Sequence, residues 1–316
     1  MFSCRLHLAV SATEEENAPK PEKSLDDHYS RLLGIVLPSV YVAILSGFCL
    51  AYKVLPGPEF IALVFFIYAA YNKKTRRFIG DWAPFIFIFL SFEALFGIVG
   101  GLNIPPHITE PITADLRLFG SIPTVVLQHY YRSAFLDYLG AFFYSLHLVL
   151  PVVFGFVLWK YSPKNFGKYT LALAIGTYSA LVTFLVYPVA PPYIGVNQVY
   201  GAGTVTRILY SVDNNIGIPF FRTIYDYISS DANAAFPSLH AMFPWLISLF
   251  ALKIKKTKAL PILVLPVGIW FSAVYLGEHY VIDVIGGVIY GTIAFLLVEK
   301  LVPRITPKLR FTRAKT

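Results

Sequence analysis

The chain has 316 residues, of which 56% are hydrophobic and only 14% charged, with a formal net charge of +8 at pH 7 and a mean hydropathy of +0.62. Soluble globular domains carry about 25% charged residues, so this composition excludes that class. Apolar runs long enough to cross a bilayer of about 30 Å, which takes about 20 helical residues, recur along the chain. The sequence therefore predicts an all-α, polytopic membrane helix bundle.

Residues 1–28 are expected to form a polar, disordered tail, because they lack the long apolar core of a cleavable signal peptide. An accessory pair of transmembrane helices is predicted within 29–79, and a basic cytoplasmic tail over 301–316. Boundaries read from sequence shift by several residues. The eight predicted transmembrane segments are 32–52, 56–72, 83–102, 138–159, 169–188, 239–253, 259–276 and 280–299.

The positions of the basic residues predict the orientation of these helices. If the N-terminal tail is cytoplasmic, all but five of the 26 lysines and arginines fall on the cytoplasmic side. Because the positive-inside rule places basic residues there, both termini are predicted to be cytoplasmic. The charges are dispersed among loops without a nucleic-acid-binding motif, so no nucleic-acid partner is expected. The five basic residues on the other side are Lys53, Arg117, Arg132, Arg207 and Arg222.

Cofactor motifs are absent from the sequence. Cys4 lies in a polar stretch and Cys49 in an apolar one, so neither a disulfide framework nor a thiolate metal site is supported. No P-loop, dinucleotide fingerprint or H-E-x-x-H zinc motif is present. We therefore expect no nucleotide, metal or other cofactor.

Two histidines lie at the non-cytoplasmic ends of predicted helices. His240 opens the sixth segment and His279 precedes the eighth, and the two helices between them have similar rises, so both side chains can reach one depth. Asp283 is expected on the same helical face as His279, where its carboxylate fixes the imidazole tautomer. His279 is then an activated nucleophile and His240 a general acid. Two long loops on this side, 103–137 and 189–237, are expected to carry short interfacial helices that roof the site.

Other residues near the pair carry weaker signals. Ser238 offers a hydroxyl and a backbone N–H at the start of the sixth helix, where a phosphate can dock. His147 lies mid-span and either joins the site or hydrogen-bonds a neighbouring helix. Asp137 either caps the fourth helix or serves the site. The spacing of Gly287 and Gly291 favours a close helix contact.

These residues resemble the motifs of the type 2 phosphatidic acid phosphatase superfamily. Its second motif, P-S-[GL]-H, appears at 237–240, and the H-x-x-x-D of its third motif appears at 279–283. Because its second motif contains leucine, the sequence is most similar to the branch of the superfamily that contains inositol phosphorylceramide synthase. That branch also shows A-P-P, present at 190–192, and Y-x-x-H-x-x-x-P, present as Tyr144, His147 and Pro151. The resemblance covers residues 80–300 and implies a catalytic membrane domain with a six-helix core there.

The resemblance also implies a phosphohistidine mechanism. His279 would attack the phosphoryl group, oriented by Asp283, while His240 protonates the leaving group and Ser238 helps to bind phosphate. The superfamily's S-R pair is replaced by Ser-Ala at 272–273, and its K-x6-R-P motif is not found. The cations that clamp phosphate are therefore missing, and the candidates to replace them are Arg117, Arg132, Arg207 and Arg222.

Three functions remain open at this stage. The first is a phosphotransferase that moves a phospho-head group, such as phosphoinositol, from a lipid donor to a lipid alcohol such as ceramide. The second is a phosphatase for phosphatidate or polyprenyl diphosphate that uses the same residues with water. The third is a transporter or proton relay built on the intramembrane ionisable residues, although no inverted repeat is found. For both enzymes, membrane lipids are the expected substrates, and the sequence identifies no partner subunit.

Overall fold

The structure, a computed structural model, describes residues 40, 43, 58–102, 104–223 and 233–305. Three predicted elements therefore lie wholly or largely outside the described residues: the tail 1–28, nearly all of the helix 32–52, and residues 306–316 of the C-terminal tail. Cys4 and Cys49 also lie outside them.

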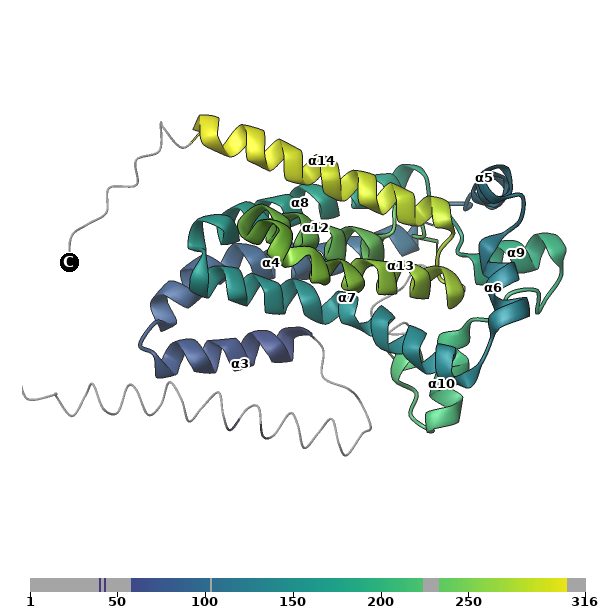
Figure 1. Ribbon diagram of the computed structural model, residues 1–316, viewed down its shortest axis with the longest axis horizontal. Helices are drawn as coiled ribbons and strands as arrows, with labels where there is room; N and C mark the ends of the chain where they lie inside the picture. Colours follow the sequence, from purple (N-terminus) through teal and green to yellow (C-terminus); the bar gives the residue numbers. More distant parts are fainter. Residues whose placement is uncertain (1–39, 41–42, 44–57, 103, 224–232, 306–316) are drawn as a thin grey trace, which may run out of the picture.

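Long helices form a bundle in which they run side by side (Figure 1). The described residues contain helices and two isolated β-bridges but no named strand, which confirms the all-α prediction. Each predicted transmembrane segment from the second to the eighth corresponds to a helix. These helices are α3 (Pro58–Tyr71), α4 (Thr75–Gly101), α7 (Ala134–Tyr161), α8 (Pro163–Val186), α12 (Leu239–Lys255), α13 (Val264–Tyr275) and α14 (Val281–Ile305).

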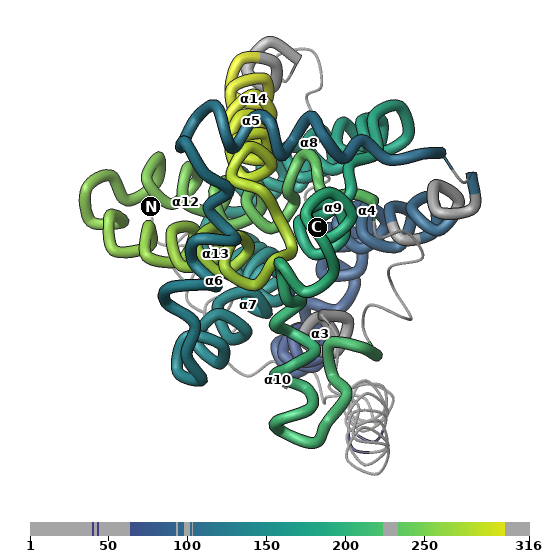
Figure 2. The backbone as a smooth tube through the Cα atoms, turned by 90° about the vertical axis from the view of Figure 1, so that its right-hand side faces the viewer, coloured from purple at the N-terminus to yellow at the C-terminus, as the bar shows by residue number. Residues whose placement is uncertain are grey.

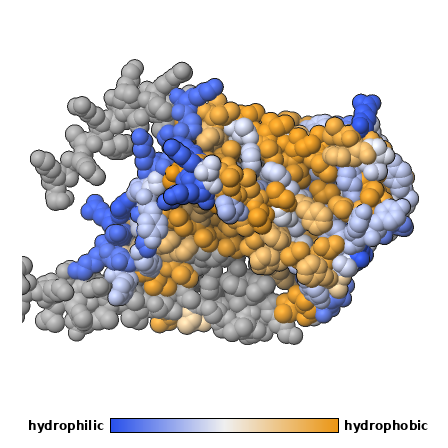
Figure 3. Space-filling view, viewed as in Figure 1, coloured by the Kyte–Doolittle hydropathy of each residue, from blue (hydrophilic) through white to orange (hydrophobic). Residues whose placement is uncertain are grey.

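Five stretches of the described chain are long and apolar enough to cross a membrane: Thr75–Gly97, Ala134–Tyr161, Pro163–Val186, Leu239–Tyr275 and Val281–Lys300. Hydrophobic side chains cover much of the flank seen in Figure 3, and hydrophilic ones gather at its left-hand end. The polytopic membrane class is thereby confirmed. The predicted number of eight crossings stays a prediction, because α3 has only 14 residues and 239–275 holds more than one helix.

The stretch 239–275 is a helical hairpin. Here α12 leads into a 3₁₀ helix, η1 (Lys256–Leu263), before α13 begins at Val264. The seventh helix, predicted over 259–276, is therefore shorter than its apolar sequence indicated. The Trp270 indole N–H donates to the Ala241 carbonyl at 3.2 Å, so the end of α13 lies beside the start of α12.

Four short helices cover one end of the bundle, as expected for the two long loops, and their position at the membrane interface stays a prediction. They are α5 (Thr109–Phe119), α6 (Pro123–Tyr131), α9 (Pro192–Tyr200) and α10 (Ile208–Ile216). Figure 2 looks onto this end, where they lie in front of the long helices. Helices α5 and α10 stop at Gly120 (φ 70°) and Gly217 (φ 68°), because glycine tolerates the left-handed turn that ends a helix. We call this end the histidine end, because His240 and His279 lie beneath the short helices.

The contact between α12 and α14 positions the site. A Cβ added to Gly287 would lie 2.2 Å from the Ser238 carbonyl oxygen, and one at Gly291 would lie 3.2 Å from the Met242 side chain. Only a glycine at 287 allows the two backbones to approach this closely. The close contact predicted from the glycine spacing is therefore confirmed.

Candidate functional site: a histidine pair at one end of the bundle

The two predicted histidines meet at the histidine end. His279 Nε2 lies 3.0 Å from His240 Nδ1, so the two rings are hydrogen-bonded to each other. His279 is 5% exposed, whereas His240 is only half-buried. The α12–α13 hairpin brings both rings to one depth, as the sequence predicted.

The second ring nitrogen of His279, Nδ1, is also hydrogen-bonded. Its Nδ1 lies 3.0 Å from the Ala235 carbonyl oxygen and 3.6 Å from Asp283 Oδ2. Because a carbonyl can only accept, Nδ1 carries the proton and the lone pair of the neutral ring resides on Nε2. The sequence predicted this tautomer but assigned its hydrogen bond to Asp283, whereas the structure gives that hydrogen bond to a backbone carbonyl.

The predicted shared helical face of His279 and Asp283 is also corrected. Helix α14 begins at Val281, so His279 precedes it and Asp283 lies in its first turn. Asp283 is fully buried, and its Oδ2 accepts from the Tyr280 backbone N–H at 2.8 Å. Its Oδ1 has no hydrogen-bond partner among the described residues. The carboxylate therefore faces His279 as a nearby negative charge that can stabilise a positive one on the ring.

The Ala235 carbonyl is positioned by three extended segments that lie side by side. Val189 pairs with His107 on one side and with Ala234 on the other in isolated parallel bridges. The Ala235 N–H donates to the Val189 carbonyl at 3.0 Å, which leaves the Ala235 carbonyl for His279. Sequence analysis missed Ala235, because a backbone carbonyl carries no signature in the residue type.

His147 and Tyr144, from the middle of α7, pack against His240. The His240 ring centroid lies 3.7 Å from that of His147 and 4.1 Å from that of Tyr144, whose ring is stacked on it. His147 Nδ1 lies 2.6 Å from the Tyr144 carbonyl, so this nitrogen donates and Nε2 keeps the lone pair. The structure thus brings His147 into the site, which settles where the side chain lies and leaves its role a prediction.

Ser238 lies beside the pair but is already hydrogen-bonded. Its hydroxyl accepts from the Ala241 N–H at 3.3 Å and caps α12, and its backbone N–H donates to the Asp283 carbonyl at 3.0 Å. The expectation that this N–H is free for phosphate is therefore wrong, because α14 takes it up. The hydroxyl proton remains available for donation.

The four candidate arginines differ in their surroundings. Arg207 binds the residue that precedes His279, because its guanidinium donates to both carboxylate oxygens of Glu278 at 2.8 and 3.2 Å. The rings of Tyr193 and Tyr210 lie 4.3 and 4.5 Å from the guanidinium carbon. The other three arginines lie further along the same end: Arg132 beside Asp137, Arg222 against Asn214, and Arg117 exposed on α5.

Asp137 takes neither of its two expected roles. Helix α7 is capped by Ser133, whose hydroxyl accepts from the Leu136 N–H at 3.3 Å. Asp137 instead accepts from the Tyr275 hydroxyl and lies 3.6 Å from Arg132. It joins α7 to the end of α13, which is a packing role that the sequence could not distinguish from capping.

The position of the missing superfamily arginine is occupied by Ala273. This residue of α13 is fully buried in a cluster with residues of α7 and α10, and its carbonyl accepts from the His279 N–H at 3.0 Å. A long cationic side chain has no room at this position. The absence of the S-R pair therefore agrees with the packing.

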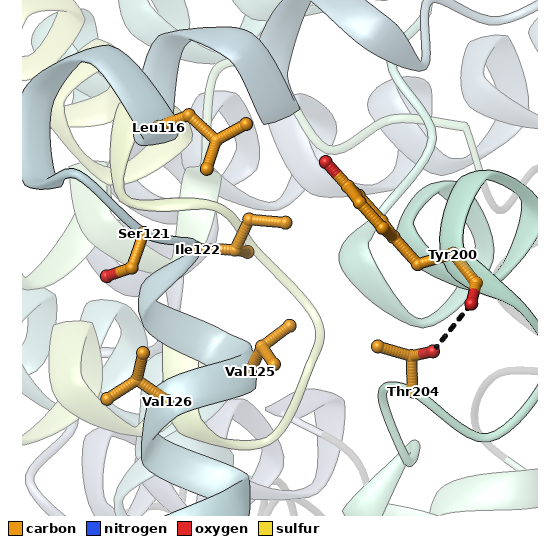
Figure 4. A pocket seen from close by; sticks show the side chains of 7 residues that line it. All are labelled: Leu116, Ser121, Ile122, Val125, Val126, Tyr200 and Thr204. Atoms are coloured by element: carbon orange, nitrogen blue, oxygen red, sulfur yellow. Dashed lines mark hydrogen bonds between the residues drawn. The ribbon is translucent and has the colours of Figure 1, made fainter.

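A pocket lies between α5, α6 and α9. Its volume is about 310 Å³, and Figure 4 shows Leu116, Ile122 and Val125 opposite Tyr200. The complete lining is Leu116, Ser121, Ile122, Val125, Val126, Tyr200 and Thr204. None of the histidines or carboxylates described above lines it.

Comparison with known proteins agrees with this geometry. The model of the PAP2 superfamily matches residues 111–297, which is more than half of the chain, so the protein belongs to the PAP2 superfamily. It is accordingly a membrane enzyme that acts on lipid phosphates. This finding favours the two enzyme hypotheses over the transporter.

One relative is a phosphoinositol dihydroceramide synthase of Bacteroides thetaiotaomicron. It is 28% identical over 244 residues, which cover 71% of this chain and 78% of the relative. No solved structure matches the chain. The resemblance to the branch containing inositol phosphorylceramide synthase is thereby confirmed.

Proposed function

We propose that this enzyme is a phosphotransferase that moves phosphoinositol from a lipid donor to the hydroxyl of a long-chain lipid such as ceramide. The observation that carries the proposal is the histidine pair, in which the lone pair of His279 Nε2 faces His240 while Nδ1 is held by Ala235. The name of the bacterial relative supports phosphoinositol as the transferred group and dihydroceramide as the class of acceptor. The acceptor, rather than the histidines, distinguishes this reaction from hydrolysis.

The first half-reaction forms a phosphohistidine. The Nε2 lone pair of His279 attacks phosphorus, a nitrogen–phosphorus bond forms, and the bond from phosphorus to the donor's lipid oxygen breaks. His240, in its protonated imidazolium form, gives a proton to that oxygen, so a neutral lipid alcohol leaves and His240 becomes neutral. Asp283 stabilises the positive charge that the His279 ring acquires, because its carboxylate lies 3.6 Å from Nδ1.

The second half-reaction reverses these bonds with a new alcohol. The acceptor hydroxyl gives its proton to His240 while its oxygen attacks phosphorus, and the nitrogen–phosphorus bond breaks. His279 and His240 then return to their starting states. If water takes the acceptor's place, the product is free inositol phosphate and the enzyme is a phosphatase.

The resting geometry requires His240 to move when the substrate binds. A separation of 3.0 Å between the two nitrogens is a direct hydrogen bond and leaves no room for a phosphoryl group between them. His240 is half-buried and flanked by Tyr144 and His147, so a shift of its ring opens the lone pair of His279. Arg207, which binds the residue before His279, is the cation that we assign to the phosphate, and Glu278 then shares it.

The test offers inositol-labelled phosphatidylinositol to the purified full-length protein in lipid nanodiscs, with and without ceramide. We expect a ceramide-dependent labelled lipid. Labelled inositol phosphate without a new lipid would establish the hydrolase instead. Absence of any turnover, with phosphatidate and polyprenyl diphosphate also inert, would refute both.

We also propose that the histidine end faces away from the cytoplasm, as the distribution of basic residues predicts. Two exposed residues at opposite ends, Gln198 and Lys164, allow a matched test after Cys4 and Cys49 are replaced by serine. A membrane-impermeant thiol reagent added to intact cells should label Gln198→Cys and spare Lys164→Cys. The reverse pattern would overturn the orientation while leaving the chemistry intact.

A further inference from the structure

A carboxylate remote in sequence reaches the start of the helix that follows His279. Asp115 lies on α5 and is fully buried. Its Oδ2 accepts from the Val281 N–H at 3.1 Å and its Oδ1 from the Ile282 N–H at 3.0 Å. Sequence analysis passed over Asp115, because its partners are backbone groups 166 and 167 residues away.

These contacts complete the N-terminus of α14. The first backbone N–H groups of a helix have no partner within the helix and carry its positive dipole end. Asp283 takes the Tyr280 N–H, and Asp115 takes the next two, so two carboxylates bind three consecutive N–H groups. These three N–H groups are then not available to a substrate phosphate. The groups serve instead to fix the backbone that carries His279 and Asp283.

We propose that Asp115 is a positioning residue for the histidine pair: by capping α14 from the roof helix α5, it fixes the distance and angle between His279, His240 and Asp283. The inference rests on the proposed function for its kinetic consequence, whereas its structural consequence can be measured without turnover. A displacement of about 1 Å in such an arrangement can cost about 100-fold in rate.

The charge of Asp115 is maintained against its surroundings. Burial, assisted by the charge of Asp283, raises the pKa of the Asp115 carboxyl from 3.8 to about 6, although the two N–H donors oppose this. Tyr280 is the other titratable group of this turn that responds to Asp115. Helix α9, which also packs on α5, has only Tyr193 and Tyr200 as titratable residues. An ionised carboxylate at this position therefore lowers the stability of the folded protein, which supports a role for Asp115 in the histidine site.

The chain offers a matched control. Asp213 on α10 is also buried, and its two oxygens accept from consecutive backbone groups, the Phe221 N–H at 3.0 Å and the Arg222 N–H at 2.8 Å. Neither Phe221 nor Arg222 adjoins the histidines in sequence. Asp115→Asn and Asp213→Asn thus remove the same charge and one of two similar hydrogen bonds, at different places.

Two measurements on both variants test the proposal. For turnover of labelled phosphatidylinositol, we expect Asp115→Asn to lower kcat by about 10- to 100-fold with KM within about twofold, and Asp213→Asn to change kcat by less than about threefold. For backbone amide exchange, we expect faster exchange in the segment 277–284 of Asp115→Asn only. The Asp213→Asn variant should instead exchange faster in 219–223.

The outcomes separate this proposal from the proposed function. If both variants lose activity equally, or if segment 277–284 of Asp115→Asn exchanges as in the wild type, Asp115 is not a positioning residue. If the wild type turns over no lipid, the proposed function fails, and the exchange measurement still decides the role of Asp115. If Asp115→Asn does not fold, Asp115→Ser, which keeps one capping oxygen, takes its place with the same expected results.

Discussion

Each end of the bundle pairs a carboxylate with basic side chains, but for a different purpose. At the end opposite the histidines, Glu299 on α14 binds Lys168 at 3.0 Å and Lys253 at 2.6 Å and so joins three helices. We call the end that contains these three residues the lysine end. Glu299 and Lys253 keep 25% and 30% of their side chains exposed, whereas His279 and Asp283 at the histidine end keep 6% and 0%. Water screens charges at the lysine end, and it cannot do so at the histidine end.

Burial of this kind is expensive unless it serves a purpose. A buried carboxylate without full hydrogen bonding lowers stability, so Asp283, with its unpartnered Oδ1, is a poor choice for holding helices together. At the lysine end, a similar carboxylate has two cationic partners and partial hydration. The comparison teaches that the exposed fraction of an ion pair, more than its sequence position, distinguishes anchoring from chemistry in this protein.

The largest expected effect comes from removing the nucleophile. His279→Ala should lower turnover at least about 10⁴-fold and abolish transfer of the label to protein, because it removes the attacking nitrogen. The label trapped on the wild type should be stable in alkali and released by acid, as expected for a phosphorus–nitrogen bond. His107→Ala is the control, because His107 lies at the same end but is paired with Glu110. Retention of labelling by His279→Ala would refute the phosphohistidine.

Neutralising the buried carboxylate should have the next largest effect. Asp283→Asn keeps the size of the side chain but removes the charge that faces His279 Nδ1, so kcat should fall by about 10²- to 10⁴-fold. The Tyr280 N–H can still bind the amide oxygen, and the variant should remain folded by circular dichroism. A kcat within twofold of the wild type would assign Asp283 to the same anchoring class as Glu299.

The pH dependence sharpens the comparison further. Because burial raises the pKa of Asp115 to about 6, the ionised cap is lost as the pH falls through 6, and wild-type kcat should fall more steeply there than that of Asp115→Asn. Unfolding does not explain such a loss. A raised folded pKa means that this group favours the folded state most below pH 3.8 and progressively less as the pH rises to 6. Equal slopes for the two proteins in kcat against pH would contradict the prediction.

The smallest effect is expected at the lysine end. Glu299→Gln should lower the free energy of unfolding by no more than about 1 kcal/mol and should leave kcat unchanged, because water screens the partly exposed pair with Lys253 and the amide oxygen still accepts from Lys168. Thermal unfolding followed in nanodiscs, together with the lipid assay, measures both. A loss of activity comparable to that of Asp283→Asn would show that the two ends are coupled.

Sequence alone predicted the helices and the histidines because both depend on local patterns. Apolar runs located α7, α8 and α14, and motif spacing located His240 and His279. It overestimated the seventh helix, because Lys256–Leu263 forms a 3₁₀ turn whose apolar residues cannot be distinguished by composition from those of a spanning helix.

The contacts that hold the pair could not be predicted in this way. Ala235 acts through its carbonyl, and Asp115 binds backbone N–H groups of another helix, so neither role depends on a recognisable residue pattern. Arg207 was a candidate cation, but its pairing with Glu278 requires the folded roof. These contacts arise from tertiary structure, where residues far apart in the chain become neighbours.

Gly287 affects the spacing of the two histidines. Its missing methyl group lets α14 approach the carbonyl of Ser238, two residues before His240, and the Ser238 N–H in turn donates to the Asp283 carbonyl. The separation of His279 and His240, between which the phosphoryl group must enter, therefore depends on the absence of a side chain at Gly287. A larger side chain at this position would push α14 away from α12 and so increase the separation of His279 and His240.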